Sequence, residues 1–238
     1  MEINVEFEDR AVAFVDVLGF KSLVSSATLS NVHLQQLSGL VNLLSSAVPS
    51  FDATIDKSVS PHLVPKHIYI SDCIILSAPL ADPSRTSYDG LAIVVMRVIQ
   101  LSHYLLQAGY LIRGGISVGS VWHTSTNIVG PAYQEAFMLE QKGHEPIVEL
   151  SASAAEHWKG GSRMILHHNN KLFVNGLFDY YMPNNLQHGV IEQTYAHYAA
   201  LADQRVMENL SESAKEKWSW FREFLRAEAP EGMKLSQA

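Results

Sequence analysis

Apolar and polar positions alternate along this chain in blocks that predict strands and helices in turn. An almost continuous apolar run, AVAFVDVL, covers residues 11–18 and predicts a strand that is buried on both faces. Gly19 ends this run, and apolar residues recur at helical spacing over 20–26 and 31–48. The segment 50–65 is polar and contains two prolines, so we expect it to be a connection.

The middle of the chain continues this alternation. Residues 67–78 (HIYISDCIILSA) are rich in isoleucine and have Ser71 and Asp72 at their centre, a pattern that predicts two short strands joined by a tight turn. Residues 88–108 carry the apolar stripe of a long helix. Residues 110–118 (YLIRGGISV) predict a further strand, whose glycines allow neighbouring backbones to approach closely.

The elements expected after this strand are short, apart from the last. They are a turn with a short strand at 120–126, a helix at 130–142, a strand at 147–150, a helix at 151–158, a hairpin of 163–168 and 171–175 through Asn169-Asn170, a polar loop at 179–189 and a largely helical region at 190–228. We therefore expect an α+β fold, with a main domain over 1–185 and a helical C-terminal extension over 186–238 that packs on it.

Composition narrows the class of protein. The chain has 238 residues and is 47% hydrophobic, enough for a sizeable core, and its formal net charge of −7 disfavours binding of nucleic acid through a broad cationic surface. Cys73 is the one cysteine, so neither an intrachain disulfide nor a cysteine-based zinc site is expected. The N-terminus is acidic and polar, and the apolar runs are shorter than a membrane span, which favours a cytoplasmic protein without membrane contact.

Asp16 is the exception within the first apolar run. A carboxylate inside a strand is costly unless it is paired or binds a cation, so Asp16 needs a partner. Asp72, at the predicted turn, is the obvious candidate, because two aspartates at the ends of neighbouring strands can hold divalent ions. An alternative stays open at this point, in which Asp16 caps the following helix and Asp72 is an ordinary turn residue.

Four segments, in order, resemble the catalytic core of the class III nucleotide cyclases. These are FVDVLGF at 14–20, similar to a metal and phosphate loop, SDCIIL at 71–76, similar to a second metal hairpin, IRGGISVG at 112–119, similar to an arginine strand, and NIVGPAYQEAFMLE at 127–140, similar to a base-recognition loop with its helix. They cover roughly the first 140 residues, and their order is more specific than any one of them. The resemblance implies a ferredoxin-like core with a mixed, mainly antiparallel sheet.

The resemblance assigns Asp16 and Asp72 as ligands of two divalent ions, Mn²⁺ or Mg²⁺, with the Val17 carbonyl assisting. In such enzymes the ions activate the ribose 3′-hydroxyl, which attacks the α-phosphate in line and expels pyrophosphate. The implied catalytic set is Asp16, Asp72 and Arg113. It would make this chain a phosphorus–oxygen lyase.

The same resemblance assigns the amides of Leu18, Gly19 and Phe20 as a cradle for the terminal phosphates. This agrees with the chemistry of a loop that leads from a strand into a helix, where free N–H groups and the positive helix end attract an anion. Arg113 matches the family's triphosphate-binding arginine. The plainer alternatives are a turn glycine at Gly19 and a surface arginine at Arg113.

The residues expected at the base depart from the purine enzymes. Asn127 falls where those enzymes have an aspartate or cysteine, and Ile68 falls where they have a lysine or glutamate. The Asn127 amide can both donate and accept, whereas Ile68 offers no hydrogen bond, and the neighbouring Tyr69 could stack or donate. The purine pattern is therefore missing.

The transition-state residues depart as well. Gln134 replaces an asparagine of the familiar enzymes, and Met138 replaces the arginine that stabilises the transition state. Such a group commonly contributes two or more orders of magnitude in rate, roughly 3 kcal/mol. Lys142, Lys171 and Lys21 are the candidate replacements.

The variant segments VDVLGF, LIRGG and GPAYQEAFMLE resemble the bacterial pyrimidine cyclases of the Pycsar antiphage defence systems. This implies a homodimer with sites at its interface, to which Asn127 comes from the second chain, and conversion of UTP to cyclic UMP that activates a separate effector. The alternatives are a cytidylate or purine cyclase, a nucleotide-binding sensor without activity, and an interaction domain with structural aspartates.

Overall fold

The computed structural model of the chain describes residues 4–53, 55, 57, 59–81, 89–161, 163–168, 170–208, 210–230 and 233. Tyr88, the first residue of the predicted long helix, and Asn169, in the predicted hairpin turn, lie outside these residues.

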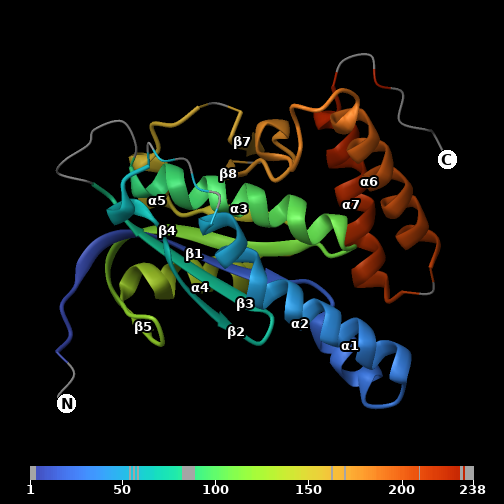
Figure 1. Cartoon of the computed structure of the whole chain (residues 1–238), viewed down its shortest axis with the longest axis horizontal. Helices are drawn as coiled ribbons and strands as arrows, with labels where there is room; N and C mark the ends of the chain where they lie inside the picture. The colour runs from blue at the N-terminus through green and yellow to red at the C-terminus, as the bar shows by residue number, and fades with distance from the viewer. Residues whose placement is uncertain are drawn as a thin grey trace.

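A single eight-stranded sheet forms the centre of the molecule (Figure 1). Its strands are β1 (Glu8–Val17), β2 (Lys66–Ile70), β3 (Cys73–Pro79), β4 (Ile112–His123), β5 (Ile128–Val129), β6 (Val148–Leu150), β7 (Ile165–His168) and β8 (Lys171–Val174). The order is β2-β3-β1-β4-β6-β8-β7, with β5 beside β4. The β4–β6 pair is parallel and the other pairs are antiparallel, which confirms the expected α+β fold with a mixed, mainly antiparallel sheet.

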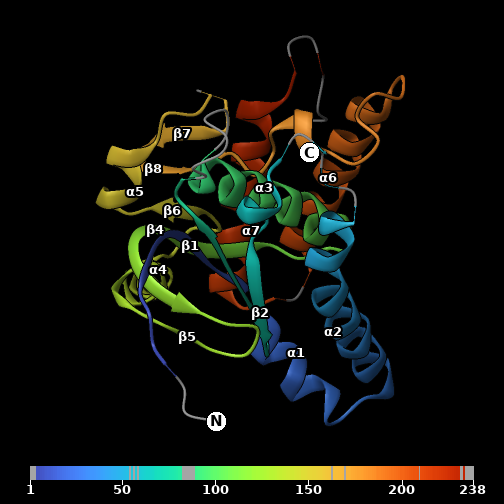
Figure 2. The ribbon, with the colours of Figure 1, turned by 60° about the vertical axis from the view of Figure 1, so that its left-hand side comes forward.

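Helices cover both faces of this sheet. They are α1 (Phe20–Ala27), α2 (Asn31–Asp52), α3 (Gly90–Gln107), α4 (Pro131–Lys142), α5 (Ala152–His157), α6 (Val190–Met207) and α7 (Glu212–Glu228), with short 3₁₀ turns at Pro61–Leu63 and Asp179–Tyr181. Helices α2 and α3 contribute to the apolar cluster on one face, and α4 contributes to the cluster on the other (Figures 1 and 2).

The continuous apolar run of β1 results from this layering. Successive side chains of a strand point to opposite faces. Ala13 and Val15 lie in the cluster on the α3 face, whereas Val12 and Phe14 lie in the cluster on the α4 face. Asp16 continues the row of Val12 and Phe14 and therefore lies on the α4 face.

Helix α3 is the core helix of the molecule. Its N-terminus is capped by Asp89, whose carboxylate accepts from the Ala92 amide at 2.8 Å, and it ends before Gly109, which has φ +86°. Within the described residues, α3 is the one helix long and apolar enough to cross a membrane. Its apolar window is 67% buried inside the protein, as expected for a core helix.

The turn and short strand predicted at 120–126 are placed wrongly. Strand β4 continues to His123, because Gly119–Val121 pair with the beginning of β1 and Trp122 and His123 pair with β5. Polar residues in this part of β4 have partners inside the sheet: the Ser120 hydroxyl donates to Asp9 at 2.9 Å, and His123 Nδ1 lies 2.6 Å from the Ser77 hydroxyl. The short strand, β5, follows at Ile128–Val129.

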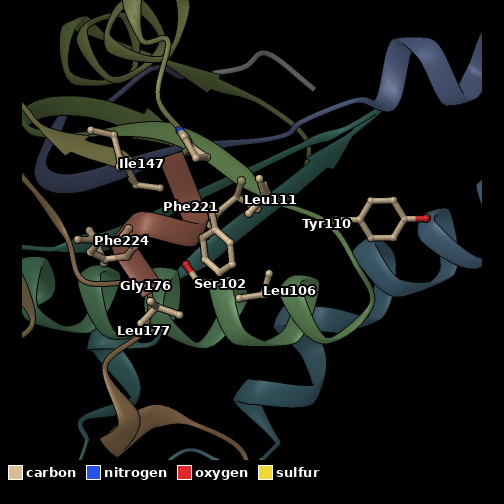
Figure 3. Close-up of a pocket in the computed structure, with 13 residues that line it drawn as sticks. Ser102, Leu106, Tyr110, Leu111, Ile147, Gly176, Leu177, Phe221 and Phe224 are labelled. Carbon is tan, nitrogen blue, oxygen red and sulfur yellow. The ribbon is translucent and has the colours of Figure 1, made fainter. Parts of the chain in front are cut away.

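The C-terminal helices share a second apolar core with the rest of the chain. Figure 1 shows α6 and α7 side by side, and their Tyr198, Phe221 and Leu225 cluster with Leu106 and Leu111. Next to this contact is a cavity of about 40 Å³ with mainly apolar walls. In Figure 3, Phe221 points into this space and the Tyr110 ring points away. The cavity is far smaller than sites for organic ligands, which measure roughly 300–1,000 Å³.

Candidate metal centre

Strand pairing brings the predicted site residues together. Asp16 in β1 lies opposite Cys73 in β3 and opposite Arg113 in β4. Asp72 occupies the turn between β2 and β3, and its carbonyl accepts from the Val17 amide at 3.2 Å. This hydrogen bond fixes the turn against the end of β1, so both aspartates lie at one end of the central strands.

Three potential ligand atoms gather at this end. The side-chain atoms of Asp16, Asp72 and Cys73 that could bind a metal all lie within 4.8 Å of one another, and all three residues are half-buried. The Cys73 Sγ is 3.6 Å from Oδ1 of Asp16 and 3.8 Å from Oδ1 of Asp72. Cys73 is therefore part of the acidic group and not an ordinary small core residue.

The carboxylates of this site lie close to one another, so their negative charges repel. Burial, followed by the nearby charges of Asp72 and Glu140, raises the pKa of Asp16 to about 7. The thiol of Cys73 and the guanidinium of Arg113 lower this pKa by less. An added cation would remove the penalty of two close carboxylates, because opposite charge favours the ionised form.

The donor set fits a hard divalent cation. Burial, followed by the charges of Asp16 and Asp72, raises the pKa of the Cys73 thiol well above its ordinary value, so the sulfur stays protonated. A thiol is a poor ligand, whereas carboxylate oxygens suit Mg²⁺ and Mn²⁺. Asp16 and Asp72 are thus the residues that would hold the ion. The role of the Val17 carbonyl and the number of ions stay predictions.

The alternative in which Asp16 caps the following helix is wrong. Gly19 occupies the N-cap position of α1, and no side chain makes a capping hydrogen bond there. Gly19 has φ +88°, a left-handed conformation that favours glycine, although a Cβ would meet no atom within 4 Å. The conformation, and not a lack of space, explains this glycine.

The phosphate cradle is smaller than predicted. The Leu18 amide donates to the Leu111 carbonyl at 3.0 Å, because pairing with the chain before β4 continues one residue past Val17, so this amide is not available to an anion. Gly19 is exposed, and α1 begins at Phe20. The first N–H groups of a helix lack acceptors within it. Gly19 and Phe20 therefore remain the candidates for binding phosphate.

Arg113 lies between two carboxylates. Its Nε donates to Oε1 of Glu140 at 2.9 Å, its Nη2 donates to the same oxygen, and its Nη1 donates to the Gly143 carbonyl at 3.0 Å. Nη2 also lies 3.9 Å from Oδ2 of Asp16. The Arg113 side chain is 21% exposed and that of Glu140 is 2% exposed, so part of the Arg113 side chain, its outward edge, is open to solvent.

Glu140, like Cys73, is a residue of this site that the sequence reasoning missed. A signal was present, since Ala132, Ala136 and Glu140 recur at intervals of four and all three are buried on the sheet-facing side of α4. The helix approaches the strand closely at Gly115, where a Cβ would lie 2.4 Å from the Ala136 carbonyl oxygen and 2.6 Å from Leu139 Cβ. This close packing brings Glu140 to Arg113.

The three residues predicted at the base do not form one surface in a single chain. Ile68 is 8% exposed and belongs to the cluster under α4, whereas Tyr69 packs on the α3 face. Burial, followed by the charge of Asp72, raises the pKa of Tyr69. Asn127 is exposed before β5, and its Oδ1 accepts from the Ile128 amide at 2.9 Å. The described contacts of Asn127 do not include Asp16 or Asp72.

The candidate replacements for the transition-state arginine differ in their surroundings. Gln134 and Met138 lie on the exposed side of α4, and Met138 is 47% exposed. Lys142 is exposed at the end of the same helix. Lys171 is paired with Glu149 at 3.0 Å, and Lys21 follows the Gly19-Phe20 loop directly.

Comparison with known proteins finds likeness at the level of structure. No family model matches the chain, and no curated protein matches it. The catalytic core of a rhodopsin-guanylyl cyclase with converted specificity, in complex with ATPαS, is similar at a TM-score of 0.49 and 16% identity, covering 72% of this chain and 98% of that chain.

Two further solved structures are similar. The adenylyl cyclase CyaB from P. aeruginosa has a TM-score of 0.46 and 16% identity, covering 72% of this chain and 94% of that chain. The monomeric guanylyl cyclase domain of the RhoGC fusion protein from the aquatic fungus Blastocladiella emersonii has a TM-score of 0.45 and 15% identity, covering 73% of this chain and 99% of that chain.

Proposed function

We propose that this chain is a pyrimidine nucleotide cyclase that converts UTP to 3′,5′-cyclic UMP and pyrophosphate. The observation that carries the proposal is the close pair of half-buried carboxylates, Asp16 and Asp72, beside a strand-to-helix loop and an arginine. Buried carboxylates at this spacing favour a bound cation. A loop with free amides beside them suits a phosphate.

The proposed chemistry divides among the chain's own residues. Divalent ions held by Asp16 and Asp72 would activate the ribose 3′-hydroxyl and offset charge on the phosphates. The Gly19 and Phe20 amides bind the terminal phosphates at the positive end of α1. The outward edge of Arg113 donates to the pyrophosphate leaving group. Arg113 therefore acts on the charge that develops as the bond to the α-phosphate breaks.

The proposed choice of base rests on what is missing at the purine positions. Ile68 is apolar and buried, so it offers no hydrogen bond to a purine edge. Asn127 is exposed and carries an amide that can donate and accept. Because Asn127 does not reach the acidic pair in one chain, we propose that it serves the site of a second copy in a symmetric homodimer. The product would act on a separate effector in antiphage defence, in the cytoplasm.

Product identification with each nucleoside triphosphate tests this proposal. Purified protein with Mn²⁺ is incubated separately with UTP, CTP, ATP and GTP, and the products are identified by mass spectrometry. We expect cyclic UMP and pyrophosphate from UTP. Cyclic CMP would correct the base within the pyrimidine class, and cyclic AMP or cyclic GMP would overturn the pyrimidine assignment.

A second candidate function has one observation in its favour. Met138 is an exposed apolar residue at the position where the familiar enzymes carry a catalytic cation. A protein without that cation could bind a triphosphate and signal by binding alone. Saturable UTP binding by calorimetry with no pyrophosphate release would support this sensor function over the enzyme.

A further inference from the structure

Two carboxylates compete for Arg113. Arg113 lies directly opposite Asp16 in the paired strands β4 and β1, where oppositely charged cross-strand neighbours attract each other. Even so, the Nη2 to Asp16 Oδ2 distance is 3.9 Å, whereas Nε donates to Glu140 at 2.9 Å. The hydrogen bonds of the guanidinium therefore go to the helix and not to the neighbouring strand.

Glu140 is held firmly in this arrangement. Its Oε1 accepts from both Nε and Nη2 of Arg113, and its Oε2 accepts from the side-chain Nε2 of Gln141. Arg113 is tied to α4 a second time, because Nη1 donates to the Gly143 carbonyl at 3.0 Å. A carboxylate as buried as Glu140 needs a charged partner, and the planar fork of a guanidinium provides it.

We propose that Glu140 is a positioning residue that holds the Arg113 guanidinium against α4 and so keeps it from hydrogen-bonding directly to Asp16. The Asp16 and Asp72 carboxylates then stay open to a divalent ion, and the outward edge of Arg113 stays open to phosphate. This inference rests on the proposed function in so far as it concerns the ion. The position of Arg113 itself does not depend on that function.

Competition for Asp16 is the physical reason for this role. An arginine paired directly with Asp16 would occupy its oxygens, and the positive charge of the guanidinium would repel an incoming cation. Glu140 removes that competitor because it supplies a second carboxylate, to which both Nε and Nη2 of the guanidinium donate. The same contact fixes the direction in which Arg113 can donate outward.

Two substitutions separate the position of Glu140 from its charge. Glu140→Asp keeps the negative charge but withdraws the carboxylate from Arg113 by about 1.5 Å, the length of one carbon–carbon bond. Glu140→Gln keeps the length and one acceptor oxygen but removes the charge. We expect Glu140→Asp to weaken Mn²⁺ binding at least tenfold, measured by electron paramagnetic resonance of free Mn²⁺. Wild-type affinity in Glu140→Asp together with a loss in Glu140→Gln would show an effect of charge alone and would overturn the inference.

A nuclear magnetic resonance measurement tests the position of Arg113 without any metal. The Nε–H signal of Arg113 is identified by its loss in Arg113→Lys. We expect Asp16→Asn to leave this signal in place and Glu140→Asp to shift it. A shift in Asp16→Asn as large as that in Glu140→Asp would overturn the inference. Wild-type protein that bound no Mn²⁺ would count against the proposed function, and the arginine signal would still decide whether Glu140 holds Arg113.

Discussion

The Cys73 thiol in β3 lies 3.6 Å from Oδ1 of Asp16 in β1, directly across the strand pair. Burial and the charges of Asp16 and Asp72 raise the pKa of this thiol, so little thiolate forms near neutral pH. The thiolate is the reactive form of cysteine. Cys73 is also the one cysteine of the chain, so its reactivity can be followed without interference.

Alkylation should therefore report on the acidic pair. At pH 8 without metal we expect iodoacetamide to modify the native protein at least tenfold more slowly than the urea-unfolded chain, because each unit of pKa increase lowers the thiolate fraction about tenfold. Asp16→Asn and Asp72→Asn should each speed the reaction in the native state. Equal rates in wild type and both variants would show that the carboxylates do not control this thiol.

Removing the Asp16 charge should stabilise the metal-free protein at high pH. The pKa of Asp16 is raised from 3.8 to about 7 in the fold, so the native state binds the proton more tightly than the unfolded state. The contribution of this group to stability is present below about pH 4 and is lost as pH rises through about 7. At pH 8 we expect Asp16→Asn to raise the free energy of unfolding by on the order of 2 kcal/mol, measured in urea without divalent ions.

His103 should make the free energy of unfolding depend on pH in the opposite direction. This buried side chain hydrogen-bonds to the Tyr198 hydroxyl and the Phe178 carbonyl, and burial lowers its pKa to about 4. The unfolded chain takes up a proton near pH 6.5, so the stability from His103 is present above that pH and declines toward pH 4. We expect a loss of about 1–2 kcal/mol between pH 7.5 and pH 5 that is smaller in His103→Gln. Identical pH profiles for both proteins would contradict this assignment.

The contact between α4 and β4 should depend on Gly115. A Cβ at this position would lie 2.4 Å from the Ala136 carbonyl oxygen, so Gly115→Ala must push α4 away from the sheet. We expect a loss of about 2–3 kcal/mol in urea unfolding, because overpacking against backbone cannot be relieved by a rotamer change. The Arg113 to Glu140 contact should loosen with it.

Gly39 provides the matched control for this substitution. It lies in α2, and a Cβ there would meet no atom within 4 Å. Gly39→Ala should leave stability unchanged or raise it by roughly 0.5–1 kcal/mol, since alanine favours a helix. A similar loss of stability in Gly115→Ala and Gly39→Ala would show that close packing against α4 is not the reason for glycine at position 115.

Local patterns predicted most elements that position the site. The run through Asp16, the turn at Ser71-Asp72 and the core helix α3 were foreseen because each has a strong period and a clear boundary. Ser71 has φ 60°, as the tight turn requires. The end of β4 was not foreseen, because its serines and His123 look like loop residues until their partners across the sheet are known.

The contacts between elements were less predictable. The Leu18 amide donates to the Leu111 carbonyl and so cannot bind phosphate, and the strand register that causes this is not encoded in the local sequence. The partnership of Arg113 with Glu140 joins residues far apart in the chain, and Cys73 enters the acidic group only through its pairing with Asp16. The sequence resemblance placed Asp16, Asp72 and Arg113 at one site. Their neighbours Cys73 and Glu140 became evident only from the fold.

Formation of a cyclic nucleotide by matched variants tests the central claim most directly. Wild type, Asp16→Asn and Asp72→Asn are incubated with UTP and Mn²⁺, and cyclic product is measured by mass spectrometry after circular dichroism confirms that each variant is folded. We expect wild type to form cyclic UMP and each variant to lose at least about 100-fold in rate. Both carboxylates are needed to hold the divalent ions whose charge stabilises the transition state. Wild-type rates in either folded variant would contradict the account.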